Sequence, residues 1–200
     1  MNANVPSRMS DRVLANARDE PDRVVLHYKL ADEWQDLGWG IIARHASRYA
    51  VVLREKGVQA GDRVIMVSEN RYEWILVDLA IQLLGAIHVP VHAPLTGHQI
   101  AYQVNDSTAV LAIVSGQDQA SKLEDVELSD PLVLMSFDPV STDRTYDDLP
   151  GAAADVADEA GDAIIQERTG NPLDTTSVAT ILYTSGTTGE PKGVMLSHHN

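Results

Sequence analysis

Short apolar runs alternate with helical segments in the middle of the chain, and this alternation limits the folds that it can adopt. The runs 62–67, 87–91 and 109–114 are rich in β-branched residues and have the length of strands. Residues 71–84 form a helical segment between the first two runs. A second helix, which begins at Thr96, separates the second run from the third. Strands that alternate with helices are typical of βαβ crossovers, so we predict an α/β fold with a mainly parallel sheet and helices on both faces.

Local signals also define elements near the N-terminus. Residues 23–28 and 34–39 have the pattern of a hairpin. Residues 41–56 show helical spacing, and Gly57 is the expected stop. The residues on the apolar face of this helix are Ile42, Ala46, Tyr49, Ala50 and Leu53.

Two further segments have weaker patterns. Thr96 and Gln99 have the spacing of a capping box, which predicts a helix that ends near Asn105. The segment 150–168 is rich in alanine and acidic residues. We expect it to form one exposed helix with a solvated charged face.

A loop near residue 190 has the composition of a phosphate-binding site. The run 183–193 reads Tyr-Thr-Ser-Gly-Thr-Thr-Gly-Glu-Pro-Lys-Gly and joins two strand-like runs, of which 178–183 has the length of a buried strand. Glycine lets main-chain N–H groups approach an anion closely. The serine and threonine hydroxyls add donors, and Lys192 adds a compact positive charge. The pattern therefore favours a nucleotide phosphate over a surface hairpin without a ligand.

The same loop differs from a Walker A motif. That motif has a glycine before its lysine and a helix after it. Here Pro191 precedes the lysine, Gly193 follows it, and an apolar run continues as a strand. The expected order is therefore strand, loop and strand.

Other polar residues favour structural roles. Asp62 and Glu69 lie at the ends of the first predicted strand, where turn or helix-cap roles are the preferred interpretation. A metal site at the histidines near 90 lacks a carboxylate or cysteine to complete it, so we interpret them as structural. The histidines near 90 are His88, His92 and His98.

The loop and its flanks resemble a known signature. Residues 181–200 resemble the AMP-binding signature of the adenylate-forming superfamily, which contains acyl-CoA synthetases, peptide-synthetase adenylation domains and luciferases. Further stretches are similar to the long-chain fatty acid–CoA ligase branch, and the resemblance covers roughly residues 20–200. These stretches are 61–74, 85–90, 96–102 and 105–107.

The resemblance implies ATP-dependent activation of a long-chain fatty acid to acyl-AMP and then to acyl-CoA. It implies ATP, Mg²⁺ and coenzyme A as cofactors or co-substrates. It assigns no catalytic residue and no protein ligand for a metal within this sequence. The residues that it assigns to the β- and γ-phosphates are Thr184, Ser185, Gly186, Thr187, Thr188, Gly189 and Lys192.

The resemblance covers the first part of the large N-terminal domain of such an enzyme. The adenine loop, the magnesium-ligating glutamate, the ribose-binding aspartate and the C-terminal domain with its catalytic lysine have no counterpart in this sequence. We therefore expect residues 1–200 to be a partial AMP-binding domain, from a truncated reading frame or an incomplete gene model, and to be inactive in isolation. Two alternatives remain: a non-catalytic nucleotide-binding or interaction module, and an adenylation domain that loads a carrier protein.

Composition restricts the partners and the location. The formal net charge of −14 argues against nucleic acid. The absence of cysteine means that any thioester needs an external thiol. The N-terminus lacks the apolar core of a signal peptide, and prolines interrupt the uncharged stretch 79–104. We expect a cytoplasmic protein with small-molecule substrates and no transmembrane segment, and peripheral membrane contact stays open.

Overall fold

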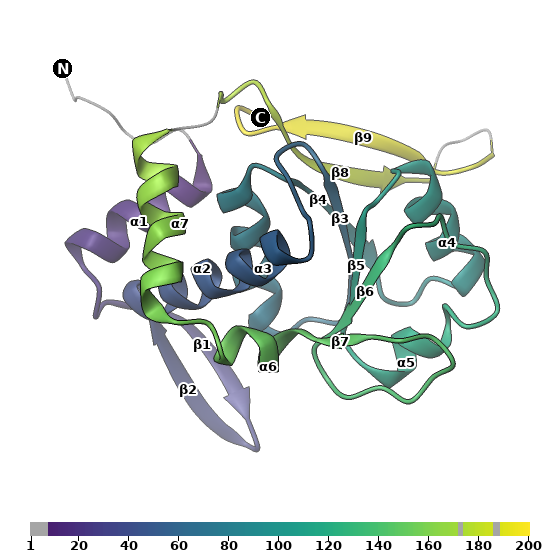
Figure 1. Ribbon diagram of the computed structural model, residues 1–200, viewed down its shortest axis with the longest axis horizontal. Helices are drawn as coiled ribbons and strands as arrows, with labels where there is room; N and C mark the ends of the chain where they lie inside the picture. The colour runs from purple at the N-terminus through teal and green to yellow at the C-terminus, as the bar shows by residue number, and fades with distance from the viewer. Residues whose placement is uncertain (1–7, 172–173, 186–188) are drawn as a thin grey trace.

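The computed structural model describes residues 8–171, 174–185 and 189–200, and within them one sheet is covered by helices on both faces (Figure 1). The sheet contains seven strands in the described part of the chain. In chain order they are β3 (Arg63–Ser68), β4 (Ile87–His92), β5 (Leu111–Val114), β6 (Val133–Ser136), β7 (Asp147–Asp148), β8 (Val178–Thr184) and β9 (Lys192–Ser197). The predicted α/β class with helices on both faces is confirmed.

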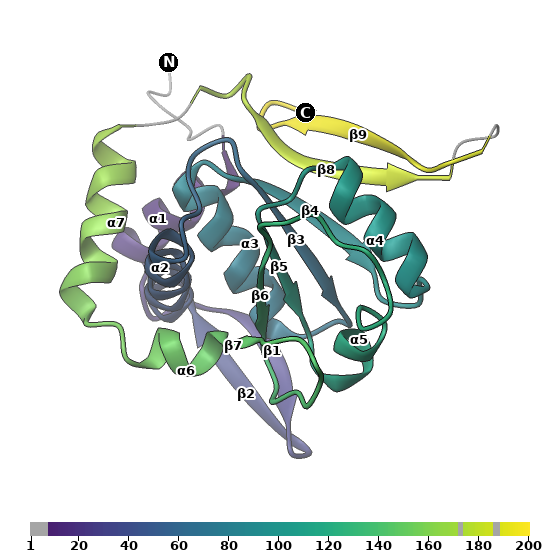
Figure 2. The same ribbon diagram turned by 45° about the vertical axis from the view of Figure 1, so that its right-hand side comes forward.

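The helices form two unequal layers, which Figure 2 shows on either side of the sheet. The thicker layer is built around the second helix of the chain, which packs against its neighbours in that layer. Its members are α1 (Met9–Asp19), α2 (Trp39–Glu55), α3 (Tyr72–Leu84), α6 (Leu149–Ala154) and α7 (Asp158–Gly170). The thinner layer contains α4 (Gly97–Asp106) and α5 (Gln117–Ser121).

The strand order is β7-β6-β5-β3-β4-β8-β9, and every neighbouring pair is parallel except β8 and β9. The chain enters the sheet at β3, places β4 on one side and returns to place β5 on the other. The order of the strands therefore reverses between β3 and β5. In open α/β sheets, ligands bind beyond the carboxyl ends of the strands at such a reversal.

Strand β3 is buried on both faces of the sheet. Met66 belongs to the apolar cluster beneath α2 and α3, whereas its neighbour Ile65 belongs to the cluster beneath α4. Both side chains have a relative exposure of 0%. Successive side chains of a strand point to opposite faces, so a continuous apolar run fits a central strand with a helix layer on each side.

The elements with local signals form as predicted. Strands β1 (Val24–Leu30) and β2 (Glu33–Gly38) make the hairpin, and Ala31 and Asp32 turn it with φ values of 47° and 69°. The five residues predicted for the apolar face of α2 are all buried. Thr96 and Gln99 form the complete capping box of α4.

The prediction of one exposed helix over 150–168 is wrong in two respects. The segment contains α6 and α7, and Asp148 caps the first of them through its bond to the Gly151 N–H. Helix α7 packs against α2, which buries Ile164 and Arg168. The Arg168 Nε donates to the Leu83 carbonyl at 2.7 Å. This bond attaches α7 to the end of α3, so one face of α7 is part of the core.

Glycine at position 97 is required by a close approach of two main-chain segments. A Cβ atom there would overlap the main-chain oxygen of Lys122, which lies beside the first turn of α4. We expect Gly97→Ala to lower the free energy of unfolding by about 1–3 kcal/mol, because main-chain atoms must move to relieve the overlap. Urea denaturation measures this change.

Gly170→Ala is the matched control, because a Cβ atom at Gly170 meets nothing within 4 Å. At an unstrained site the same substitution is neutral or stabilises by about 0.4–1 kcal/mol. Equal destabilisation of the two variants would contradict the steric explanation for Gly97.

Candidate phosphate-binding site

The candidate phosphate-binding loop joins the strands of the β8–β9 hairpin at one border of the sheet (Figure 1). Strand β8 runs parallel to β4, so its carboxyl end points to the same edge of the sheet as those of β3 and β4. The loop begins at this end. A nucleotide held by the loop would therefore lie at the edge where α/β sheets bind their ligands.

The structure brings together the two ends of the predicted site. Thr184 is the last residue of β8 and Lys192 the first of β9, and they are paired across the two strands. Ser185 and Gly189 are exposed beside them, and Gly189 has a φ of 135°, which favours glycine. The predicted residues Gly186, Thr187 and Thr188 lie outside the described residues.

The predicted strand over 178–183 is confirmed as part of β8, but its expected burial is wrong, because no residue of β8 is fully buried. Within the described residues, β8 pairs with β4 through one residue pair, His88 and Thr180. The Thr180 hydroxyl also donates to the His88 carbonyl at 2.9 Å. Pro90, two residues further along β4, has no N–H to donate, so it cannot extend this ladder.

The outer strand of the hairpin exposes apolar side chains. Val194 is 44% and Met195 67% exposed in β9, and Leu182 of β8 is also exposed. Leu182 and Val194 are cross-strand partners on one face of the hairpin, whereas Met195 lies on the other face.

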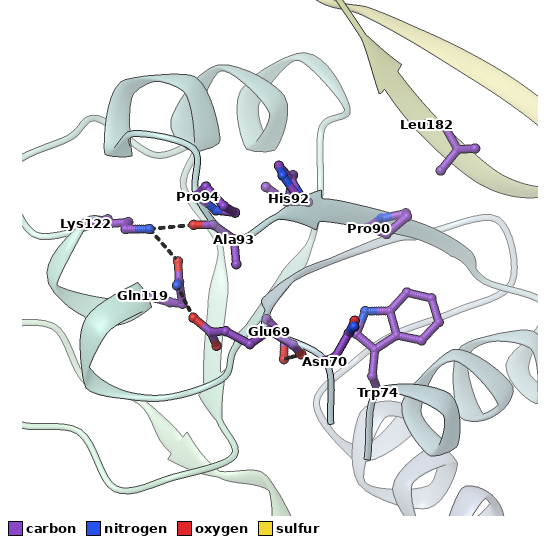
Figure 3. Close-up of a pocket in the computed structure, with 12 residues that line it drawn as sticks. Glu69, Asn70, Trp74, Pro90, His92, Ala93, Pro94, Gln119, Lys122 and Leu182 are labelled. Carbon is purple, nitrogen blue, oxygen red and sulfur yellow. Dashed lines mark hydrogen bonds between the residues drawn. The ribbon is translucent and has the colours of Figure 1, made fainter. Parts of the chain in front are cut away.

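A cavity of about 630 Å³ lies beside β8, at the carboxyl ends of β3 and β4 (Figure 3). Its wall combines apolar and polar side chains, and Trp74 lines it from α3 and Leu182 from β8. The lining residues are Ser68, Glu69, Asn70, Trp74, Pro90, Val91, His92, Ala93, Pro94, Gln119, Lys122 and Leu182.

Glu69 connects the strands at the reversal point, which corrects the prediction of a turn or helix-cap role. Its carboxylate accepts hydrogen bonds from the Ser115 hydroxyl and from Gln119 Nε2. The bond from Ser115 is the main cause that lowers the pKa of Glu69 below its usual value. Lys122 Nζ donates to the Ala93 carbonyl at 2.5 Å and to Gln119 Oε1 at 3.0 Å. Asp62, by contrast, accepts from the Gln59 N–H in a turn, as predicted.

The histidines occupy different environments. His88 is buried, and its Nδ1 lies 2.7 Å from an Asp78 carboxylate oxygen, which confirms a structural role. His92 and His98 are exposed, and His92 lines the cavity. Burial lowers the pKa of His198, whose main-chain N–H donates to the Ser177 carbonyl. Within the described ranges, no cluster of three metal-ligating side chains occurs.

Sequence reasoning missed Trp74, Gln119 and Lys122 as cavity residues. Trp74 lies in α3, Gln119 in α5 and Lys122 directly after α5. These two helices follow different strands, and the order of those strands is not visible in the sequence. A sequence analysis that placed β5 next to β3 would have predicted Gln119 near the carboxyl end of β3, because α5 follows β5. In the part of the chain that the structure covers, no helix has both the length and the apolar character to cross a bilayer.

Comparisons with known proteins relate this chain to one family. The family model for AMP-binding enzymes matches residues 13–200. The long-chain-fatty-acid–CoA ligase FadD15 of Mycobacterium tuberculosis is 33% identical over 193 residues, which are 94% of this chain and 31% of that protein. The medium/long-chain-fatty-acid–[acyl-carrier-protein] ligase FadD10 of the same organism is 29% identical over 196 residues, which are 97% of this chain and 33% of that protein.

Solved structures share the fold. A crystal structure of Brucella canis acyl-CoA synthetase matches with a TM-score of 0.78 at 20% identity, over 99% of this chain and 35% of that chain. The fatty acyl-adenylate ligase from L. pneumophila, in complex with acyl adenylate and pyrophosphate, matches with a TM-score of 0.71 at 22% identity, over 98% of this chain and 31% of that one. The chain spans about a third of the length of the curated relatives FadD15 and FadD10. From the match over residues 13–200, we conclude that this chain belongs to the AMP-binding enzyme family.

Proposed function

We propose that this chain carries the phosphate-binding part of an enzyme that activates a long-chain fatty acid with ATP and transfers it to coenzyme A. The observation that carries the proposal is the pairing of Thr184 with Lys192 at the base of a glycine- and hydroxyl-rich loop. The loop begins at the carboxyl edge of a mainly parallel sheet, where such folds bind nucleotides. The similarity to FadD15 supports the fatty acid and coenzyme A as substrates.

The proposed reaction has two steps. A fatty acid carboxylate oxygen attacks the α-phosphorus of ATP, the bond from this phosphorus to the bridging oxygen breaks, and pyrophosphate leaves. The thiolate of coenzyme A then attacks the acyl carbon of the mixed anhydride, and AMP leaves with the electron pair of the broken C–O bond. Negative charge grows on the pyrophosphate during the first step, so a fixed cation beside it lowers the barrier.

In the proposal, different residues of the loop neutralise charge, donate hydrogen bonds and provide main-chain freedom. Lys192 neutralises the charge of the β- and γ-phosphates, and the hydroxyls of Thr184 and Ser185 donate to their oxygens. The same assignment extends to Gly186, Thr187 and Thr188, and Gly189 provides the main-chain freedom. Mg²⁺ would supply additional charge neutralisation between the phosphates. Hydroxyl oxygens fit this hard cation, although most of its ligands would be phosphate and water oxygens.

Calorimetric titration of the chain with MgATP tests the phosphate-binding role. We expect Lys192→Ala to weaken binding about 10- to 100-fold, because it removes a charge-assisted contact of about 1.5–3 kcal/mol. Lys29→Ala is the matched control, since Lys29 is an exposed lysine of the β1–β2 hairpin and its loss changes the net charge equally. Equal affinity of the wild-type chain and Lys192→Ala would refute the assignment.

A carrier protein in place of coenzyme A is the second candidate, and the similarity to FadD10 favours it. Both candidates share acyl-AMP formation, so they differ only in the thiol that attacks the anhydride. Thioester formation by an active enzyme that contains these residues distinguishes them. Product with coenzyme A alone supports the first candidate, and product with a carrier protein alone supports the second.

A further inference from the structure

Helix α4 presents two polar groups to the phosphate-binding hairpin. Tyr102 and Asp106 are four residues apart on α4, so they lie on the same face of the helix. In both ribbon views α4 lies next to β8 (Figures 1 and 2). The first arm of the hairpin is β8, and the second arm is β9 with Pro191 directly before it. Each of the two residues contacts a different arm.

The second arm is bound by Tyr102. Its hydroxyl donates to the Pro191 carbonyl at 3.1 Å. This carbonyl belongs to the peptide group that joins Pro191 to Lys192, so the bond fixes the plane of the peptide directly before the lysine. The ring of Pro191 fixes its own φ, so the main chain that leads into Lys192 can adopt fewer conformations.

The first arm is bound by Asp106. The Tyr183 hydroxyl donates to Asp106 Oδ2 at 2.6 Å. Burial and this bond raise the pKa of Tyr183 above its usual value, which keeps the hydroxyl protonated as the donor. The rings of Tyr102 and Tyr183 meet edge to face with centroids 6.4 Å apart, so the two attachments form one contact region.

A glycine completes this region. Gly193 is paired with Tyr183 across the hairpin, and a Cβ atom at Gly193 would lie 3.2 Å from Cζ of the Tyr183 ring. The ring therefore lies close to the main chain of β9, one residue after Lys192. The Tyr183 ring thus restricts the space beside the residue that follows Lys192.

We propose that Tyr102 and Asp106 are positioning residues that hold the two arms of the phosphate-binding hairpin, and that Tyr102 thereby orients Lys192 toward the phosphates of the nucleotide. The proposal rests on the proposed function for the phosphates, and it adds residues outside the loop to that site. The ladder between β4 and β8 gives the hairpin no main-chain support near Lys192, because among the described residues it contains only the pair of His88 and Thr180. The hydrogen bonds from α4 take its place.

A double-mutant cycle with MgATP affinity as the readout tests the role of Tyr102. Tyr102→Phe keeps the ring contact and removes only the hydroxyl. We expect it to weaken MgATP binding about 3- to 10-fold in the wild-type background, and to have less than a twofold effect in the Lys192→Ala background. An effect of equal size in both backgrounds would overturn the proposal, because a general structural role would not depend on Lys192.

Tyr146→Phe is the matched control, because the Tyr146 hydroxyl is buried and has no hydrogen-bond partner among the described residues. It is expected to leave the affinity within twofold. Asp106→Asn, which retains an acceptor oxygen for Tyr183, is expected to weaken binding less than Asp106→Ala.

Hydrogen exchange provides a readout that needs no nucleotide. The amides of Gly193 and Val194 are expected to exchange at least threefold faster in Tyr102→Phe than in the wild-type chain or in Tyr146→Phe. Unchanged exchange together with unchanged affinity overturns the proposal. If the wild-type chain binds no MgATP, the proposed function fails, and unchanged exchange then refutes the attachment by α4 separately.

Discussion

Replacement of Ile65 by alanine is expected to lower the free energy of unfolding by about 2–5 kcal/mol, and replacement of its neighbour Met66 to cost a similar amount. Both side chains are fully buried, but they belong to different apolar clusters on opposite faces of the sheet. Each truncation removes apolar contacts and leaves a cavity in its own cluster. Urea denaturation of the two variants measures both changes.

The double variant distinguishes two separate clusters from one continuous core. Because the two side chains share no cavity, their effects should add within about 0.5 kcal/mol. Leu30→Ala serves as the control, since Leu30 is 58% exposed in the β1–β2 hairpin and its loss should stay within about 0.5 kcal/mol. A loss below 1 kcal/mol for either core variant would mean that one face of β3 is not covered as described.

Replacement of Asp78 by alanine is expected to destabilise the chain by about 2–4 kcal/mol. The Asp78 carboxylate lies 2.7 Å from His88 Nδ1 and accepts from Gln82 Nε2 at 2.9 Å. All three residues are buried, so alanine leaves two polar groups without partners in the interior. Thermal and urea unfolding at neutral pH measure the loss.

Asp78→Asn separates the hydrogen bonds from packing. Asparagine has nearly the same shape and keeps one acceptor oxygen, so we expect an intermediate loss of about 1–2 kcal/mol. A loss as large for asparagine as for alanine would assign the effect to the carboxylate charge. A negligible loss in both variants would show that the pair with His88 contributes nothing to stability.

Elements that depend on neighbouring residues could be predicted from the sequence. The capping box of Thr96 and Gln99 and the apolar face of α2 are set by residues within a turn or two, and both are present. The segment 150–168 was misjudged because its burial depends on a distant partner. Arg168 bonds to Leu83, which lies 85 residues earlier, and composition alone gives no sign of this contact.

The candidate site also has one part that its local sequence predicts and one part that depends on distant residues. The loop around Lys192 can be proposed as a phosphate site from its own residues, since glycines, hydroxyls and a lysine lie close together there. The cavity was not identified, because it depends on which strands become neighbours. Glu69 and Ser115 are 46 residues apart, and they meet only because β5 is inserted next to β3.

The position of β9 at the border of the sheet affects how the chain behaves in concentrated solution. Its outer row of main-chain donors and acceptors is a template for strand addition, and the exposed Val194 and Met195 add solvent-accessible apolar area to that template. Under the proposed function, intermolecular pairing along this border would compete with nucleotide binding for the geometry of the same hairpin. The aggregation state of a sample and its apparent nucleotide affinity would then be linked quantities.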